Sequence, residues 1–205
     1  MKTSSTISIC LITVGLLSCD PAHAEIIDFE GLTGLGQKFP GTGSDPYSEG
    51  GYNVTHGPND NLGQFNVAGS KALGHFDVGG AQIRIDKGGS VFTFLGLDLR
   101  QDVAGVANPT VKVYGFTGAV IDYSGVAVAS ETFTAPSGSF STFLATVGNL
   151  AGVSNLTHLL IDLDTAISAQ TFVDNVQVVP EPSSFAFLAL IATGGMTVRR
   201  RRKRT

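Results

Sequence analysis

The stretch that most clearly decides the fold reads His158-Leu159-Leu160-Ile161-Asp162-Leu163. Leu159, Ile161 and Leu163 fall on one side of an extended chain, whereas Asp162 falls on the other. This alternation is typical of an antiparallel strand with one buried face. Along residues 91–95 apolar side chains occupy both faces, so we expect that strand inside a sheet and not at its edge.

Short apolar or alternating segments recur from residue 25 to residue 179, separated by Gly, Asn, Asp and Pro, and no run shows helical periodicity. The pattern predicts an all-β domain, an antiparallel β-sandwich of the jelly-roll kind. Predicted strands cover residues 26–29, 52–56, 64–67, 81–85, 91–99, 110–116, 120–123, 126–129, 140–147, 158–163 and 171–179.

The charges of this middle domain are unbalanced. Residues 25–179 hold six basic and fifteen acidic side chains, a net charge of −9. An acidic domain without a basic stripe is a poor ligand for nucleic acid, so we expect no nucleic-acid partner. Both cysteines, Cys10 and Cys19, precede residue 25, which excludes disulfides, thiol catalysis and cysteine metal sites from the domain. A chain of this length can bury a core without them.

Residues 1–24 have the pattern of a secretory signal peptide. Lys2 gives the positive start, residues 7–17 are apolar, and Ala22 and Ala24 form a small-x-small cleavage site. We therefore expect the mature chain to begin at Glu25. The alternative is a lipoprotein signal, in which Cys19 would be the lipidated residue.

The C-terminal end has three parts in order. The domain is expected to end at residue 179, before Pro180, Glu181 and Pro182, because two prolines remove backbone donors and force an extended chain. An apolar stretch over residues 185–198 then forms the predicted membrane helix, which includes Phe185, Leu188, Leu190, Ile191 and Val198. A stop-transfer cluster follows, made of Arg199, Arg200, Arg201, Arg202, Lys203 and Arg204. Basic clusters remain cytoplasmic, so the domain is expected on the far side of the inner membrane.

This arrangement over residues 180–205 resembles the PEP-CTERM sorting signal of exported proteins in Gram-negative bacteria that make exopolysaccharide. The resemblance implies processing by exosortase, a membrane-embedded enzyme similar to a cysteine transpeptidase. Pro180, Glu181 and Pro182 would then be the recognition residues, and residues 185–198 a transient anchor. An ordinary single-pass anchor with a proline-rich stalk is the alternative, since both begin as a membrane-anchored precursor.

Within the domain the most informative residue is Asp174. In an unbroken strand Phe172, Asp174, Val176 and Val178 share one face, which places a carboxylate in an apolar row. An unpaired buried carboxylate is very costly, so Asp174 must be satisfied by backbone N–H groups, by a cation, or by a bulge that turns it outward.

Asp28 and Glu30 lie just inside the expected N-terminus. The opening Phe29-Glu30 with the closing Phe172-x-Asp174-Asn175-Val176 resembles carbohydrate-binding-module β-sandwiches, in which a structural calcium bridges the termini. The resemblance implies Ca²⁺ held by Asp28, Glu30 and Asp174, a hard cation on oxygen ligands. Hydrogen bonding of Asp174 to loop amides is the alternative.

No catalytic residue can be assigned. Asp98, Arg100 and Asp102 alternate past a strand and could line a site, but surface charges commonly do this. His56, His75 and His158 lack metal-ligand spacing, and Gly-x-Ser-x-Gly is absent. Because the chain has no Trp, a sugar-stacking platform has to come from Tyr47, Tyr52, Tyr114 or Tyr123.

We therefore expect a non-enzymatic exported protein, anchored transiently in the membrane and then placed at the cell surface or outside the cell. Its partners are expected to be the export machinery, exosortase and exopolysaccharide, with a structural or glycan-binding role in biofilm. A secreted polysaccharide hydrolase or lyase is the alternative, because fifteen acidic residues allow many carboxylate pairs.

Overall fold

The computed structural model describes residues 23–33, 35, 39, 47–57, 62–75, 81–102, 109–163 and 170–181, which belong to one compact unit spanning Ala22–Ser184. The predicted signal segment up to residue 22, Pro182, the predicted anchor and the basic cluster lie outside the described residues. Within these ranges no helix is long and apolar enough to cross a membrane.

The described residues form two antiparallel sheets. The strands of the first sheet are β1 (Glu25–Ile27), β4 (Leu62–Val67), β5 (Ser70–His75), β7 (Phe92–Gln101), β10 (Ser141–Leu144) and β12 (Thr171–Pro180). Their order is β10-β7-β12-β5-β4, with β1 also paired to β12. The strands of the second sheet are β2 (Tyr47–Glu49), β3 (Tyr52–His56), β6 (Ala81–Asp86), β8 (Thr110–Phe116), β9 (Ala129–Thr134) and β11 (His158–Leu163). Their order is β2-β3-β6-β11-β8-β9.

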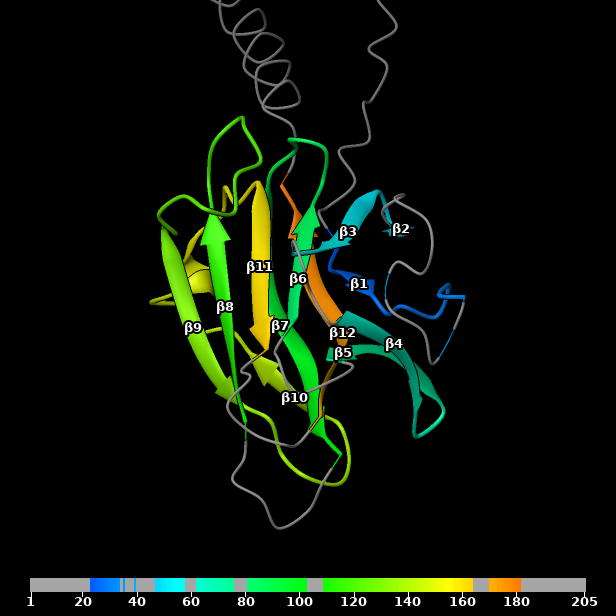
Figure 1. Ribbon diagram of the computed structural model, residues 1–205. Helices are drawn as coiled ribbons and strands as arrows, with labels where there is room; N and C mark the ends of the chain where they lie inside the picture. Colours follow the sequence, from blue (N-terminus) through cyan, green and yellow to red (C-terminus); the bar gives the residue numbers. More distant parts are fainter. Residues whose placement is uncertain are drawn as a thin grey trace, which may run out of the picture. The chain divides into compact units, whose positions relative to one another are not determined.

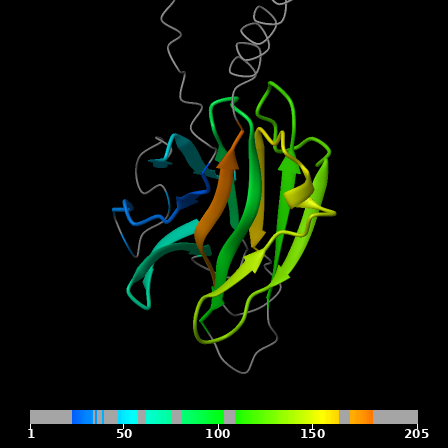
Figure 2. The same ribbon diagram turned by 180° about the vertical axis from the view of Figure 1, so that it is seen from behind.

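The two sheets pack face to face as a β-sandwich, with the second sheet toward the viewer in Figure 1 and the first sheet toward the viewer in Figure 2. Alternate residues of most strands point into the main apolar core, as the period of two requires. A smaller apolar cluster contains Val67, Ala72 and Phe172. Fully buried examples from both sheets are Ile83, Ile85, Phe94, Leu97, Val113, Leu159, Ile161 and Val173. The predicted β-sandwich is confirmed.

Several predicted strands match the observed ones closely. Those predicted at residues 52–56, 110–116 and 158–163 are β3, β8 and β11. The strand expected inside a sheet is β7, between β10 and β12. The strands predicted at 120–123 and 126–129 are wrong: both fall in the connection from β8 to β9, in which two glycines and one aspartate favour turns, and only Ala129 belongs to a strand.

The chain ends of the domain lie side by side, because β1 pairs with β12 through Glu25 and Val178. The prediction that Phe172, Asp174, Val176 and Val178 share one face is wrong. A β-bulge lies between Asp174 and Gln177, where Asn175 has a φ of 46°. The bulge turns Val176 into the core and leaves Asp174 on the outward side.

Candidate functional site

The four tyrosines divide into two groups. Tyr52 is fully buried in the core, edge-on to Phe92. Tyr47 packs against Phe29 and donates a 3.0 Å hydrogen bond to Glu49. Burial and the neighbouring Glu49 raise the pKa of the Tyr47 hydroxyl. Tyr114 and Tyr123 lie instead on the outward side of the second sheet, where both are half-buried.

The outward side of β3, β6, β11, β8 and β9 carries mostly polar side chains, and we call it the outer face. Its members, in rows that follow the strand register, are Asn53, Asp86, His158 and Phe116; then Thr55, Arg84, Leu160, Tyr114 and Ser130; then Gln82, Asp162, Lys112 and Thr132. The middle row crosses five strands, which at about 4.8 Å per strand makes it about 19 Å long.

Arg84 is the central charged residue of the outer face. Its guanidinium lies 4.9 Å from the centre of the Tyr123 ring and donates to Gln82 Oε1 at 3.3 Å. Arg84 Nε and the Tyr123 hydroxyl are both buried without a hydrogen-bond partner among the described residues. Burial and the charge of Asp86 raise the pKa of Tyr123, so the hydroxyl keeps its proton as a donor. Buried polar groups are normally paired, and two unpaired donors on neighbouring side chains therefore make this place a candidate site for a polar ligand.

The rings of Phe116 and His158 pack against Tyr123 and hold it in place. His158 is 1% exposed and stacks on Phe116 at 4.9 Å with an interplanar angle of 1°. Tyr123 meets the His158 ring edge-on at 4.9 Å. The two His158 nitrogens contact Thr157 Oγ1 at 2.9 Å and Asp122 O at 3.0 Å. The contact with Asp122 fixes the residue next to Tyr123, so the connection from β8 to β9 is tied to the sheet.

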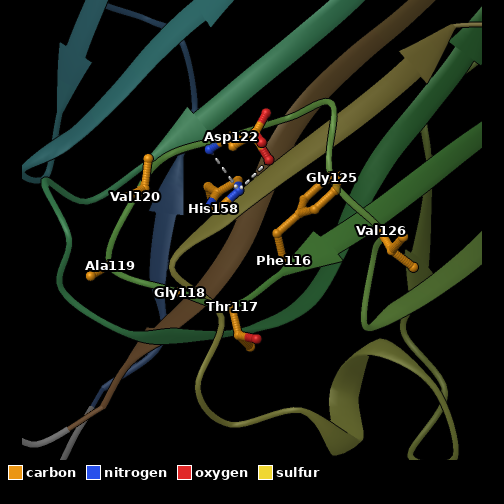
Figure 3. Close-up of a pocket in the computed structure, with 9 residues that line it drawn as sticks. All are labelled: Phe116, Thr117, Gly118, Ala119, Val120, Asp122, Gly125, Val126 and His158. Atoms are coloured by element: carbon orange, nitrogen blue, oxygen red, sulfur yellow. Dashed lines mark hydrogen bonds between the residues drawn. The ribbon is translucent and has the colours of Figure 1, made fainter.

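A pocket of about 400 Å³ opens beside these three rings. It is lined by Phe116, Thr117, Gly118, Ala119, Val120, Asp122, Gly125, Val126 and His158. Figure 3 shows the β8–β9 connection looping around His158, with Val120 and Val126 on opposite sides of the opening. These valines are 76% and 95% exposed, and Ser124 lowers the pKa of the Asp122 carboxyl by donating to it. The pocket thus combines several apolar side chains with one ionised carboxylate. It lies at the end of the outer face where Phe116 and His158 are paired.

The predicted carboxylates lie on the other side of the sandwich, outside the first sheet, in what we call the turn cluster: Glu30, Ser70, Lys71, Asp98, Asp174 and Asn175. Ser70 Oγ lies 2.5 Å from Asp174 Oδ2 and 3.1 Å from Glu30 Oε1, so one hydroxyl bridges two carboxylates. Asp28 is not among them: its carboxylate accepts from the Glu30 N–H at 2.9 Å, and its own N–H donates to Glu49. Of the predicted calcium ligands, Glu30 and Asp174 are brought together and Asp28 lies apart.

Asp174 is 1% exposed and is satisfied within the chain. Besides Ser70, the Asn175 N–H donates to it at 2.8 Å. The Asn175 side chain donates to Asp98 Oδ2, also at 2.8 Å, across the β7–β12 pair. Burial raises the pKa of Asp174 to about 6. The hydrogen bonds from Ser70 and Asn175 lower this pKa, whereas the negative charges of Asp98 and Glu30 raise it further.

The remaining candidates do not gather into a site. His75, His56 and His158 lie on β5, β3 and β11, and His75 Nε2 accepts from the Thr171 N–H at 3.0 Å. In the part of the chain that the structure describes, no three His, Cys, Asp or Glu side chains are arranged to hold a metal ion. Arg100 lies beside Asp98 on the outward side of β7, and Asp102 follows the end of that strand.

The first two residues of the Pro-Glu-Pro motif belong to the sheet. Pro180 is the last residue of β12 and pairs with Phe92. The Glu181 N–H donates to Val91 O at 3.1 Å, and Thr93 Oγ1 donates to the Glu181 carboxylate at 2.7 Å. The folded domain therefore includes Pro180 and Glu181, which lie beyond its predicted end at residue 179.

Sequence reasoning did not find Arg84, Ser70 or Lys71. The polar alternation Gln82, Arg84, Asp86 along β6 was a visible signal for the outer face. Ser70 and Lys71 gave none, since their role depends on Glu30 and Asp174, which lie 40 and 104 residues away from Ser70.

No known family profile and no curated protein matches the chain. Among solved structures, the carbohydrate-binding module CBM29_1 of Piromyces equi matches 80% of this chain and 93% of its own, with 11% identity and a TM-score of 0.48. TmCBM61, solved with β-1,4-galactotriose, matches 67% of this chain and all of its own at 10% identity and a TM-score of 0.40. The agarase AgWH50C matches 68% of this chain over 24% of its own, at 8% identity and a TM-score of 0.43. These likenesses are to the β-sandwich, at identities too low to carry over a ligand.

Proposed function

We propose that the protein is a non-enzymatic, exported glycan-binding β-sandwich, and that the outer face is its binding surface. The observation that carries this proposal is the pair of Arg84 and Tyr123, whose orphaned buried N–H and O–H lie on a face with Tyr114. A sugar supplies hydroxyl groups to such donors and a C–H surface to the rings. Gln82, Asp162 and Lys112 add further hydrogen-bonding groups along the next row.

The hydrolase or lyase alternative is less well supported by the carboxylates. Hydrolysis of a glycoside needs two carboxyl groups that reach the substrate. Asp98 and Asp174 are directly opposite each other, but Asp174 is 1% exposed and engaged with Ser70 and Asn175. We expect no product when the chain is incubated with the exopolysaccharide of its host, and chain shortening of that polysaccharide would favour the enzyme.

The binding proposal is tested by calorimetric titration of the full chain in detergent. The probes are host exopolysaccharide, cellohexaose, mannohexaose and galactotriose. We expect saturable binding of at least one probe, and a loss of affinity of about tenfold or more in Arg84→Met, because a hydrogen bond to a charged group contributes about 1.5–3 kcal/mol. Thr142→Ala, an exposed change on the outward side of the first sheet, serves as the matched control.

Unchanged affinity in Arg84→Met, or equal losses in Arg84→Met and Thr142→Ala, would contradict a site on the outer face. Absence of binding to every probe would leave a structural role for the domain and remove the glycan-binding one.

We further propose that the chain is exported across the inner membrane and sorted by exosortase to the cell surface or the biofilm matrix. The strand boundaries support this proposal: β1 begins at Glu25, directly after the expected cleavage site, and β12 ends at Pro180, the first residue of the sorting motif. Mass spectrometry of the protein from its native host tests it. A start at Glu25 and an end between Pro180 and residue 184 are expected. An intact Arg204 would mean a permanent anchor, and a lipidated Cys19 a lipoprotein.

A further inference from the structure

The turn that follows β1 is wrapped around one lysine. Phe29 has a φ of 58°, a left-handed conformation that is uncommon for a residue with a side chain, and Leu32 N–H donates to Phe29 O at 2.9 Å to close the turn. Lys71 on β5 reaches into this turn, and its ammonium donates to Glu30 O and to Leu32 O, the latter at 3.2 Å. The turn therefore presents two carbonyl oxygens to one cationic group.

Carboxylates surround the same place. The Lys71 N–H donates to Glu30 Oε1 at 2.9 Å, and Ser70 links Glu30 to Asp174. Asp98 joins through Asn175, and its Oδ1 atom is buried without a partner among the described residues. Three carboxylates thus lie close to the turn that Lys71 enters, and Ser70 and Asn175 link them. Among the described residues the Lys71 ammonium forms no ion pair with them and is held by the two backbone carbonyls.

Backbone carbonyls and carboxylates are also the oxygen ligands that Ca²⁺ prefers. The oxygens that this turn could offer to a calcium ion are Glu30 O, Leu32 O and the Glu30 carboxylate. Lys71 already donates to all three, through its ammonium to the two carbonyls and through its backbone N–H to the carboxylate. An ammonium and a divalent cation cannot occupy the same few ångströms, because their charges repel each other strongly at that separation.

We infer that the Lys71 ammonium takes the place of a structural metal ion in this sandwich, so that the native domain does not depend on calcium and the loss of Lys71 opens a divalent-cation site. The site would be formed by the Glu30 and Leu32 carbonyls with the Glu30 and Asp174 carboxylates. This inference is independent of glycan binding, which occurs on the opposite side of the sandwich.

Thermal unfolding of the full chain in 5 mM CaCl₂ or in chelator tests the inference. For the native chain we expect the same Tm in both. For Lys71→Met in chelator we expect a Tm lower by about 5 °C, because the hydrogen bonds from a charged donor to two backbone carbonyls are lost. Calcium should recover about 3 °C or more of that loss. Lys112→Met, an exposed lysine of the second sheet, should respond to neither.

Two outcomes overturn the inference. A higher Tm of the native chain in calcium would mean that the ion binds with Lys71 present. A Lys71→Met variant that is equally unstable with and without calcium would mean that no cation site is opened. If Lys71→Met does not fold in chelator, refolding it in calcium decides the question, since recovery of the folded state is expected only where the ion replaces the ammonium.

Discussion

The turn cluster and the outer face both bring charged groups together on one side of a sheet, but they differ in how those groups are satisfied. In the turn cluster, Ser70, Lys71 and Asn175 supply donors to most of the carboxylate and carbonyl oxygens around them, while the Asp98 Oδ1 atom is buried without a partner among the described residues. On the outer face, Arg84 and Tyr123 keep buried donors without partners among the described residues. The first arrangement stabilises the fold, and the second leaves hydrogen-bonding capacity for a ligand. Substitutions in the turn cluster should therefore change the free energy of unfolding, and substitutions on the outer face should change glycan affinity.

The largest expected effect is on the pH dependence of stability, through Asp174. Its pKa is about 6 in the folded domain, above the value of about 4 in an unfolded chain. Between these values the folded state binds more protons, so this group's stabilising contribution is complete below about pH 4 and is lost as the pH rises through 6. The loss amounts to about 3 kcal/mol for a shift of two units. Asp174→Asn should remove that decline, as measured by urea unfolding from pH 4 to pH 7.5.

Asp122→Asn is the matched control for this experiment. The pKa of Asp122 is lowered by its bonds from Ser124, so its contribution has the opposite sign and is lost as the pH falls. The native decline between pH 4 and pH 7.5 should persist in Asp122→Asn. The same decline in Asp174→Asn would show that the turn cluster does not hold a carboxyl with a raised pKa.

A smaller effect is expected from removing one hydroxyl on the outer face. Tyr123→Phe deletes a buried O–H that has no partner in the described part of the chain, so the free energy of unfolding should stay unchanged or rise slightly. Glycan affinity should fall about threefold to tenfold, the value of one hydrogen bond. Calorimetric titration and urea unfolding of the same samples measure both quantities.

Ser70→Ala makes the corresponding change in the turn cluster. It leaves the Glu30 and Asp174 carboxylates without their bridging donor, and we expect it to lower the free energy of unfolding by about 1–3 kcal/mol while glycan affinity stays unchanged. A destabilised Tyr123→Phe, or a Ser70→Ala variant with weakened binding, would erase the distinction between the two regions.

The sequence predicted the sandwich well where the hydrophobic period was regular. The alternation of residues 158–163 determined both the strand β11 and its buried face, and β3 and β8 were predicted at the same bounds. β5 was missed because Ser70-Lys71-Ala72-Leu73-Gly74-His75 has little β-branched content. Gly74 is needed there, since a Cβ atom would lie 2.7 Å from the Phe172 ring on the neighbouring strand, and only the fold reveals this.

The candidate site was less predictable than the fold, because it depends on burial and on contacts between residues far apart in the sequence. Tyr114 and Tyr123 were recognised as platform candidates, but the four tyrosines remained equivalent until the structure buried Tyr52 and engaged Tyr47 with Phe29 and Glu49. Asp174 was recognised as a carboxylate that must be satisfied, yet its partner Ser70 comes from a hairpin 104 residues earlier. Contacts of this kind depend on strand register, which local sequence patterns do not specify.

The central claim, that the outer face binds a glycan, is tested most directly by an NMR titration. The ¹⁵N-labelled full chain in detergent is titrated with the probe that binds best, and the shifted backbone amides are mapped onto the structure. We expect the shifts to concentrate on β6, β8 and β11 and on residues 117–126, with little change along β5, β7 and β12. Shifts centred on β5, β7 and β12, or saturable binding without shifts around Arg84 and Tyr123, would contradict the account.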